Sequence, residues 1–147
     1  MLKRFFCISI ALLSFACSCA ASERVFSLED VTFNNSTAYD KKQKQPITGV
    51  ITEHSDSGVL LSEISYKKGI KNGVAKAYFD SGALLMERHF AHGAIVGVVK
   101  VYYESGVLLK EQSFQNGKMN GLQITYDKSG KIRKKTVYKE GKPVSTE

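Results

Sequence analysis

The residues best suited to acid–base or metal chemistry are few in this chain of 147 residues, which has three histidines. His89 and His92 lie three positions apart, but a metal site would need at least a third ligand, and no nearby cysteine or well-spaced carboxylate supplies one. His54 occupies a position where tyrosine recurs later in the chain, so we interpret it as an aromatic substitute. We therefore expect no bound metal.

Serine and glutamate also recur without forming a catalytic arrangement. Four serines each precede a glycine, namely Ser57, Ser81, Ser105 and Ser129. A hydrolase nucleophile would need Gly-x-Ser-x-Gly between a strand and a helix, and phosphate-cradling glycine motifs are absent. Three glutamates recur 24 residues apart: Glu63, Glu87 and Glu111. We interpret them as partners of Lys76 and Lys100 on neighbouring strands rather than as a catalytic dyad. The sequence indicates no enzyme and no cofactor.

The spacing of the glycines indicates the repeated structural elements that position these serines, glutamates and histidines. All twelve belong to three series with a period of 24 residues. The series are Gly49, Gly73, Gly97 and Gly121; Gly58, Gly82, Gly106 and Gly130; and Gly69, Gly93, Gly117 and Gly141. They define four repeats, at 49–72, 73–96, 97–120 and 121–144. Residues 145–147 form a short tail.

Each repeat predicts one β-hairpin. Two runs rich in Val, Ile, Leu, Tyr and Phe alternate with turn signals, which is typical of strands. The dipeptides Asn72-Gly73, Asn116-Gly117 and Asn120-Gly121 are strong turn signals because both residue types tolerate positive φ. We therefore predict an all-β fold in which successive hairpins form an elongated, single-layer antiparallel meander.

The segment ahead of the repeats, residues 21–48, looks less regular. Within it, 31–40 predicts a degenerate hairpin turning at Asn34-Asn35, and we interpret 21–30 as a mobile lead.

The strand pattern predicts an aliphatic and an aromatic ladder on one face, the core. The first run contributes Val50/His54, Val74/Tyr78, Val98/Tyr102 and Leu122/Tyr126, and the second Leu60/Tyr66, Leu84/Phe90, Leu108/Phe114 and Ile132/Tyr138.

The other face is predicted to have an apolar centre in the two middle repeats. A single-layer sheet must cover such a centre, either by curling or by binding a partner. The candidate partner surface is Phe79, Leu85, Val101, Tyr103 and Leu109.

The repeat pattern G-V-x-K-x-Y-[YF]-x-S-G-x-L-L-x-E-x-x-F-x-x-G, clearest in 73–93 and 97–117, resembles the MORN repeat in the variant form common in bacterial proteins. The resemblance implies a twisted sheet of successive hairpins. It also implies roles in membrane association, scaffolding and dimerisation for eukaryotic members, and an antitoxin-like label for bacterial ones. An exported chain departs from that label, since it would not meet a cytosolic toxin.

The first twenty residues predict a signal peptide. Lys3-Arg4 precedes a short apolar run that ends in small residues. Cleavage after Ala20 would remove every cysteine (Cys7, Cys17 and Cys19), which leaves a mature chain without thiol chemistry. We expect a periplasmic or secreted protein; lipid anchoring at Cys17 or Cys19 is the alternative.

The charge of +7 suggests a second kind of partner. The last repeat is rich in cations, and the candidate basic surface is Lys128, Lys131, Arg133, Lys134, Lys135, Lys139 and Lys142. These side chains could contact an anionic membrane or envelope surface. The alternatives are a solubilising end and, for the whole chain, an unknown protein partner or self-association through the apolar surface. Export and the patchy charge argue against nucleic acid.

Overall fold

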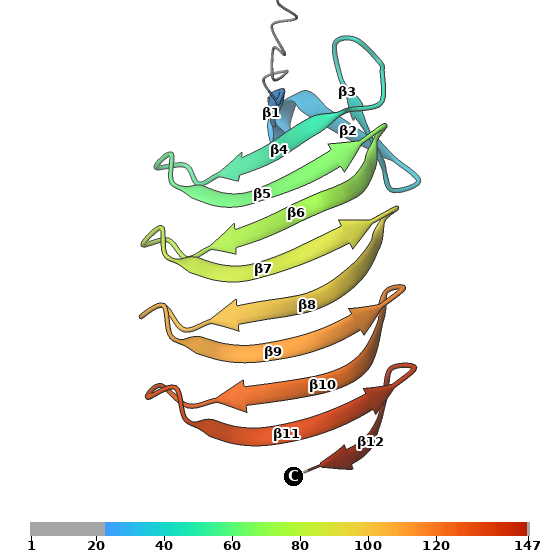
Figure 1. Cartoon of the computed structure of the whole chain (residues 1–147). Helices are drawn as coiled ribbons and strands as arrows, with labels where there is room; N and C mark the ends of the chain where they lie inside the picture. The colour runs from blue at the N-terminus through green and yellow to red at the C-terminus, as the bar shows by residue number, and fades with distance from the viewer. Residues whose placement is uncertain (1–22, 147) are drawn as a thin grey trace, which may run out of the picture.

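The computed structural model describes residues 23–146, and its main feature is an open sheet of ten strands (Figure 1). The first strands are β1 (Val25–Ser27), β2 (Val31–Asn34), β3 (Thr37–Asp40) and β4 (Gly49–His54). The repeats continue with β5 (Leu60–Lys67), β6 (Ile70–Tyr78), β7 (Leu84–Ala91), β8 (Ala94–Tyr102), β9 (Leu108–Gln115), β10 (Lys118–Tyr126), β11 (Ile132–Lys139) and β12 (Lys142–Thr146). From β4 to β12 each strand pairs antiparallel with the next, so the predicted meander is confirmed.

The amino-terminal end of the sheet carries a small cap. Strand β1 pairs parallel with β4, and a 3₁₀ turn (Leu28–Asp30) leads into the separate β2–β3 hairpin. Apolar side chains from this segment, including Phe26, Val31 and Ala38, form a buried cluster with Ile51 and Tyr66 of the repeats. The hairpin predicted at 31–40 is confirmed, with its positive-φ turn at Asn35-Ser36, one residue later than expected. The prediction of a mobile lead is wrong for 25–30, because these residues are paired with β4 or packed beside it.

Along one long edge of the sheet the strands are joined by two-residue turns. Lys68-Gly69, His92-Gly93, Asn116-Gly117 and Glu140-Gly141 all have positive φ at both positions, as a type I′ hairpin requires. The predicted turn at Asn116-Gly117 is therefore confirmed. The turns predicted at Asn72-Gly73 and Asn120-Gly121 are wrong: these residues lie inside β6 and β10, where the pairing register shifts and the strand bends.

The opposite edge carries the Ser-Gly turns. In the third hairpin the Gly106 amide donates to the carbonyl oxygen of Tyr103 (2.8 Å), and the Tyr103 amide donates to that of Val107 (2.8 Å). Gly106 has a φ of 83°, which a side chain would strain. A Cβ atom at Gly106 would meet no atom within 4 Å, so backbone conformation alone requires glycine there.

Consecutive hairpins are tied together through the glycines of the type I′ turns. The amide of Gly93 donates to the carbonyl oxygen of Lys71 (2.9 Å), and that of Gly117 to Ile95 (2.9 Å). The same bond joins Gly69 to Ile47 and Gly141 to Met119. The last three turns are thus anchored to the hairpin before them, and the first turn is anchored to the segment that leads into β4, which explains why this glycine series keeps the 24-residue period.

The cross-strand register corrects the predicted faces. Phe90 lies opposite Gly73, and Val74 lies opposite His89. Residues directly opposite each other share a face, so Phe90 lies with Ala75, whereas Val74 lies with Lys76 on the other side. The prediction that the aliphatic and aromatic ladders share one face is therefore wrong. Alternation assigns faces within a strand, but an offset of one residue between strands exchanges them.

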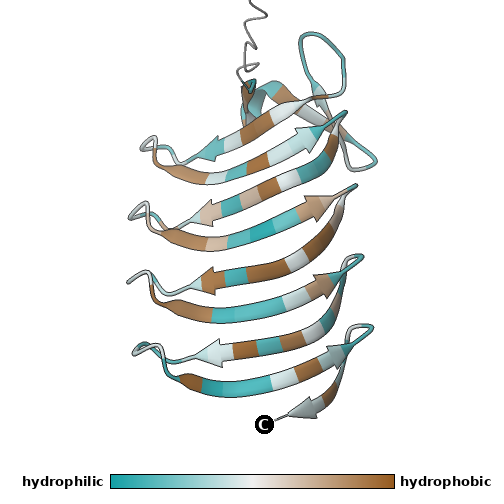
Figure 2. Cartoon of the chain, viewed as in Figure 1, coloured by the Kyte–Doolittle hydropathy of each residue, from teal (hydrophilic) through white to brown (hydrophobic). Residues whose placement is uncertain are grey.

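The face that carries Ala75, called here the Ala75 face, is the more buried one at the strand centres. Ala75 is 1% exposed and Val99 5%, whereas Val98 and Leu122 on the opposite, Lys76 face are 41% and 39% exposed. Figure 2 shows the corresponding alternation of hydrophobic and hydrophilic bands along the central strands. Since the described part of the chain places no second layer over β7 and β8 (Figure 1), the bent sheet and its own side chains bury this centre.

A pair of glycine substitutions separates conformational strain from close packing. Both Gly69→Ala and Gly106→Ala place a side chain at positive φ, which costs about 1–2 kcal/mol. At Gly69 the new Cβ would also approach the carbonyl oxygen of Ala38 at 2.9 Å. We expect Gly69→Ala to lower the free energy of unfolding clearly more than Gly106→Ala in urea denaturation. Equal losses would contradict the close contact between the cap and the first turn.

Candidate interaction surface

The Lys76 face carries a ladder of alternating charges. The register places Glu63 opposite Lys76 and Lys76 opposite Glu87; Lys100 then lies between Glu87 and Glu111. The predicted pairing of the recurring glutamates with lysines on neighbouring strands is therefore confirmed. Lys76 and Glu63 approach most closely, with Nζ 3.2 Å from Oε1. These half-exposed pairs fix register more than they add stability.

Two tyrosines of this face bind the glutamates of the ladder. The hydroxyl of Tyr78 donates to Oε1 of Glu63 (2.7 Å), and that of Tyr126 to Oε2 of Glu111 (2.9 Å). Burial, followed by the bond to Glu63, raises the pKa of Tyr78 to about 12. The same hydrogen bond lowers the pKa of the Glu63 carboxyl, and burial raises that of Tyr126. These tyrosines are structural.

The corresponding tyrosine of the third repeat, Tyr102, has the same cross-strand register but different contacts. Within residues 23–146 it has no such bond to Glu87, and instead it lines a hollow of about 450 Å³. Phe79 and Leu85 of the second repeat and Tyr103 and Leu109 of the third form the rest of the apolar lining. Glu104, Ser105 and Lys128 complete the lining at the Ser-Gly edge.

The hollow brings together four of the five residues predicted as a partner surface. Val101 is the exception, because it is paired with Met86 and Lys110 and does not line the hollow. Tyr102 was missed, since its place in the repeat is that of a packing tyrosine. Tyr103 is fixed by its hydroxyl, which donates to the carbonyl oxygen of Tyr126 (3.0 Å).

The hollow occurs where two adjacent repeats carry the same apolar pair. The position of Phe79 and Tyr103 is Ser55 in the first repeat and Asp127 in the fourth. The position of Leu85 and Leu109 changes to Arg133 in the fourth repeat. The fourth repeat therefore lacks both apolar side chains and the first repeat lacks the aromatic one, so the complete pair occurs only in the two middle repeats.

The predicted basic surface is not gathered into one patch. Lys128 and Lys131 lie in or next to the last Ser-Gly turn, whereas Lys139 and Lys142 flank the type I′ turn at the opposite edge. The remaining three follow one another along β11 at positions 133, 134 and 135, so their side chains alternate between the two faces.

The histidines of the described residues do not belong to a group of side chains that could bind a metal ion. Nε2 of His89 lies 3.6 Å from Oε1 of Glu87, and His92 is in a turn. In the described range 23–146, no group of three or more His, Cys, Asp or Glu side chains has a metal-binding arrangement. No helix in that range is long and apolar enough to cross a membrane.

The open meander of near-identical hairpins defines a β-repeat protein. The family model of the MORN repeat variant matches residues 95–116 and 119–140, which fall on the β8–β9 and β10–β11 hairpins. Two adjacent hairpins of this chain thus match the MORN repeat variant, in agreement with the sequence pattern.

Other comparisons add little. No curated protein matches the chain. Among four matching chains of solved structures is one from the crystal structure of accessory secretory protein 1, 2 and 3 in Streptococcus pneumoniae, with 17% identity and a TM-score of 0.39. The match covers 81% of this chain but 20% of that one. At this TM-score the likeness carries no argument about fold or function.

The hydrogen bond between Tyr78 and Glu63 lies at a site that makes the stability of the fold depend on pH. A tyrosine in the unfolded chain has a pKa near 10.0, whereas folded Tyr78 has a pKa of about 12. The raised pKa therefore stabilises the folded state at pH values below 10.0, and this contribution is lost as the pH rises from 10.0 to about 12. Glu63→Gln removes the charged acceptor. The pKa of Tyr78 should then fall but stay raised, because burial is the larger cause. Ultraviolet titration of tyrosinate measures this change.

Tyr78→Phe identifies which step of that titration belongs to Tyr78. A Tyr78 titration unaltered by Glu63→Gln would contradict the hydrogen bond.

Proposed function

We propose that this chain is an exported, non-catalytic MORN-variant protein that acts as a protein-interaction or scaffold module. The observation that carries this proposal is the hollow lined by Phe79, Leu85, Tyr102, Tyr103 and Leu109. Its apolar floor and mixed-charge rim are typical of an anchor site for a protein partner.

Rigidity supports the same proposal. The lining comes from strands and turns held on both sides by backbone pairing, and Tyr103 is fixed through Tyr126. A preformed site loses little conformational entropy when a partner binds. An aromatic or aliphatic side chain of a partner entering the hollow would bury the rings without displacing a structural contact.

A double substitution tests the hollow. Phe79→Ser with Tyr103→Ser removes two ring walls, and we expect binding to the partner, or self-association, to weaken at least about tenfold, which corresponds to about 1.4 kcal/mol. Cross-linking in the native cells followed by purification identifies bound partners, and sedimentation velocity measures self-association. Circular dichroism establishes that the variant is folded.

The matched control removes apolar area elsewhere. Ile132→Ser with Val144→Ser changes two residues that are 47% and 60% exposed and lie outside the hollow. This control should keep the partners of the natural chain. Identical partners and self-association in a folded Phe79/Tyr103 variant would exclude the hollow as the interaction site.

Export is the second part of the proposal. It is supported by the basic start, short apolar run and small-residue end of 1–20, which lie outside the described residues. Sequencing the amino terminus of the protein from fractionated cells should find a chain that begins just after Ala20, in the periplasm or medium. A chain that begins at lipid-modified Cys17 or Cys19 would favour the lipoprotein alternative, and an uncleaved cytosolic chain would contradict export.

A further inference from the structure

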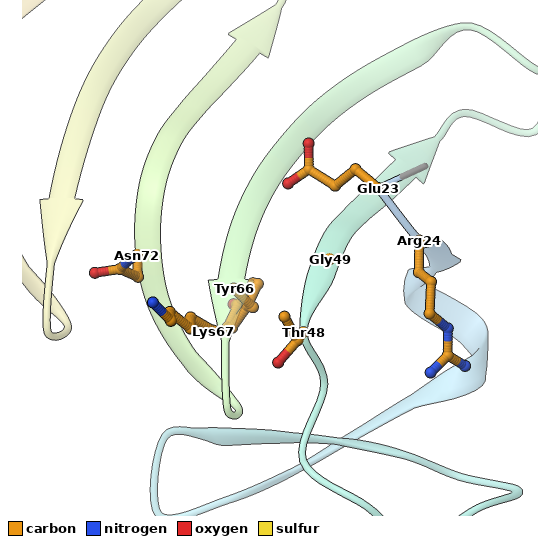
Figure 3. A pocket seen from close by; sticks show the side chains of 7 residues that line it. All are labelled: Glu23, Arg24, Thr48, Gly49, Tyr66, Lys67 and Asn72. Carbon is orange, nitrogen blue, oxygen red and sulfur yellow. The ribbon is translucent and has the colours of Figure 1, made fainter. Parts of the chain in front are cut away.

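The long edge opposite the hollow contains a pocket with a different chemistry. The pocket has a volume of about 440 Å³ and is lined by Lys67, Lys68, Ile70, Asn72 and His92. Two lysines, an asparagine and a histidine thus line one cavity, and no aspartate or glutamate is part of its lining. A larger neighbouring cavity shares two of these residues, and Figure 3 shows the side chain of Lys67 extending towards Asn72 there.

The backbone of the pocket is fixed by hydrogen bonds from both turns. The amide of Lys68 donates to Oγ1 of Thr48 (3.0 Å), and the amide of His92 donates to Oδ1 of Asn72 (3.4 Å). Because Oδ1 of Asn72 accepts this bond, its Nδ2 group is left to donate elsewhere. The site therefore offers donors from two consecutive repeats on an ordered backbone.

The two turns that form the pocket carry lysine and histidine where a type I′ turn most favours asparagine. Type I′ turns favour asparagine before glycine, as in Asn116-Gly117, but Lys68 and His92 occupy that position with φ of 52° and 50°. Glu140, in the fourth turn, also departs from asparagine, and there the side chain forms an ion pair with Lys118 at 2.9 Å. Lys68 and His92 form no such ion pair among the described residues, and both residues line the pocket.

The charge of the whole edge favours an anionic ligand. The residues in and beside the four type I′ turns include six lysines but a single glutamate: Lys67, Lys68, Lys71, Lys118, Lys139, Lys142 and Glu140. At the Ser-Gly edge the same turn position carries acids in three repeats, Asp56, Asp80 and Glu104. An anion approaching the sheet is therefore attracted to the edge that contains the pocket.

We propose that Lys67, Lys68, Asn72 and His92 form a binding site for a phosphate group of the phosphomonoester class. Its charge of about −2 at neutral pH matches two lysines, and its several oxygens can accept bonds from the amide and the imidazole as well. A carboxylate offers one charge and two oxygens, and would leave part of this donor set unused. The proposal is independent of the hollow, which lies at the other edge of the sheet.

Titration with inorganic phosphate, followed by amide NMR shifts at constant ionic strength, tests the site. We expect saturable shifts confined to residues 67–72 and 92–93, and an affinity at least tenfold lower in the Lys67→Gln/Lys68→Gln variant. The matched control Lys131→Gln/Lys134→Gln removes the same charge in the last repeat, outside both the pocket and the hollow, and should bind phosphate as the natural chain does. Equal weakening in both variants, or shifts spread along the edge to Lys118 and Lys139, would overturn the proposal.

A second pair of variants separates binding from folding. Lys68→Asn and His92→Asn replace strained residues with the one that the turn favours, so each should raise the midpoint of thermal unfolding and yet weaken phosphate binding. Unchanged phosphate affinity in both stabilised variants would overturn the proposal.

The source of the phosphate group is decided by two further probes, glycerol 1-phosphate and vesicles of phosphatidylcholine with or without phosphatidic acid. A response to glycerol 1-phosphate alone supports the site with a soluble ligand. A response to both that is lost in Lys67→Gln/Lys68→Gln supports a lipid headgroup. Adsorption to anionic vesicles without any response to soluble phosphate would overturn the proposal.

Discussion

The structure depends on one repeated backbone contact, the hydrogen bond from the glycine of each type I′ turn to a carbonyl of the preceding hairpin or, for Gly69, of the segment that leads into β4. In a single-layer sheet each hairpin is stabilised mainly by its neighbours, so the bonds between hairpins determine whether the array forms at all. The donor of this bond is a glycine at positive φ, and the acceptor lies in a segment where the strand bends. Both features must recur at the same spacing, which accounts for the strict period of this glycine series.

The same contact explains which parts of the fold are predictable from sequence. Repeats, strands and the pairing of Glu87 with Lys100 follow from local periodicity and from the neighbour-to-neighbour order of a meander. The face of the sheet on which each side chain lies could not be predicted. The pairing offset between two neighbouring strands places Phe90 and Val74 on opposite faces, and the bends near Gly73 and Gly121 change that offset. A glycine at positive φ has the same sequence signature in a turn as in a bent strand. For this reason Asn72-Gly73 resembles Asn116-Gly117 although their structures differ.

The candidate sites arise where the repeats depart from one another. Phe79 and Tyr103 were recognisable from sequence because their counterparts Ser55 and Asp127 are polar. Tyr102 was not, since only the three-dimensional structure shows that it lacks the glutamate bond of Tyr78 and lines the hollow. The basic pocket was hidden for another reason. Lys67 and His92 are 25 positions apart, and the stacking of consecutive turns brings them together. A regular scaffold thus presents an apolar site at one edge and a cationic site at the other.

The most direct test of this account is the unfolding of a variant that lacks one complete repeat, residues 97–120. This deletion joins Val96 to Gly121 and keeps every remaining turn glycine one period from the next. Thermal unfolding followed by circular dichroism should show a retained β-sheet spectrum and one cooperative transition at a lower midpoint, because one interface between hairpins is lost. Removing the half-repeat 97–108 leaves the hairpins before it intact but reverses the direction of every later strand, so it should lower the midpoint further and reduce the β-sheet signal. Equal midpoints and equal β-sheet signals in the two variants would contradict a fold that is specified by the hydrogen-bonded glycine period.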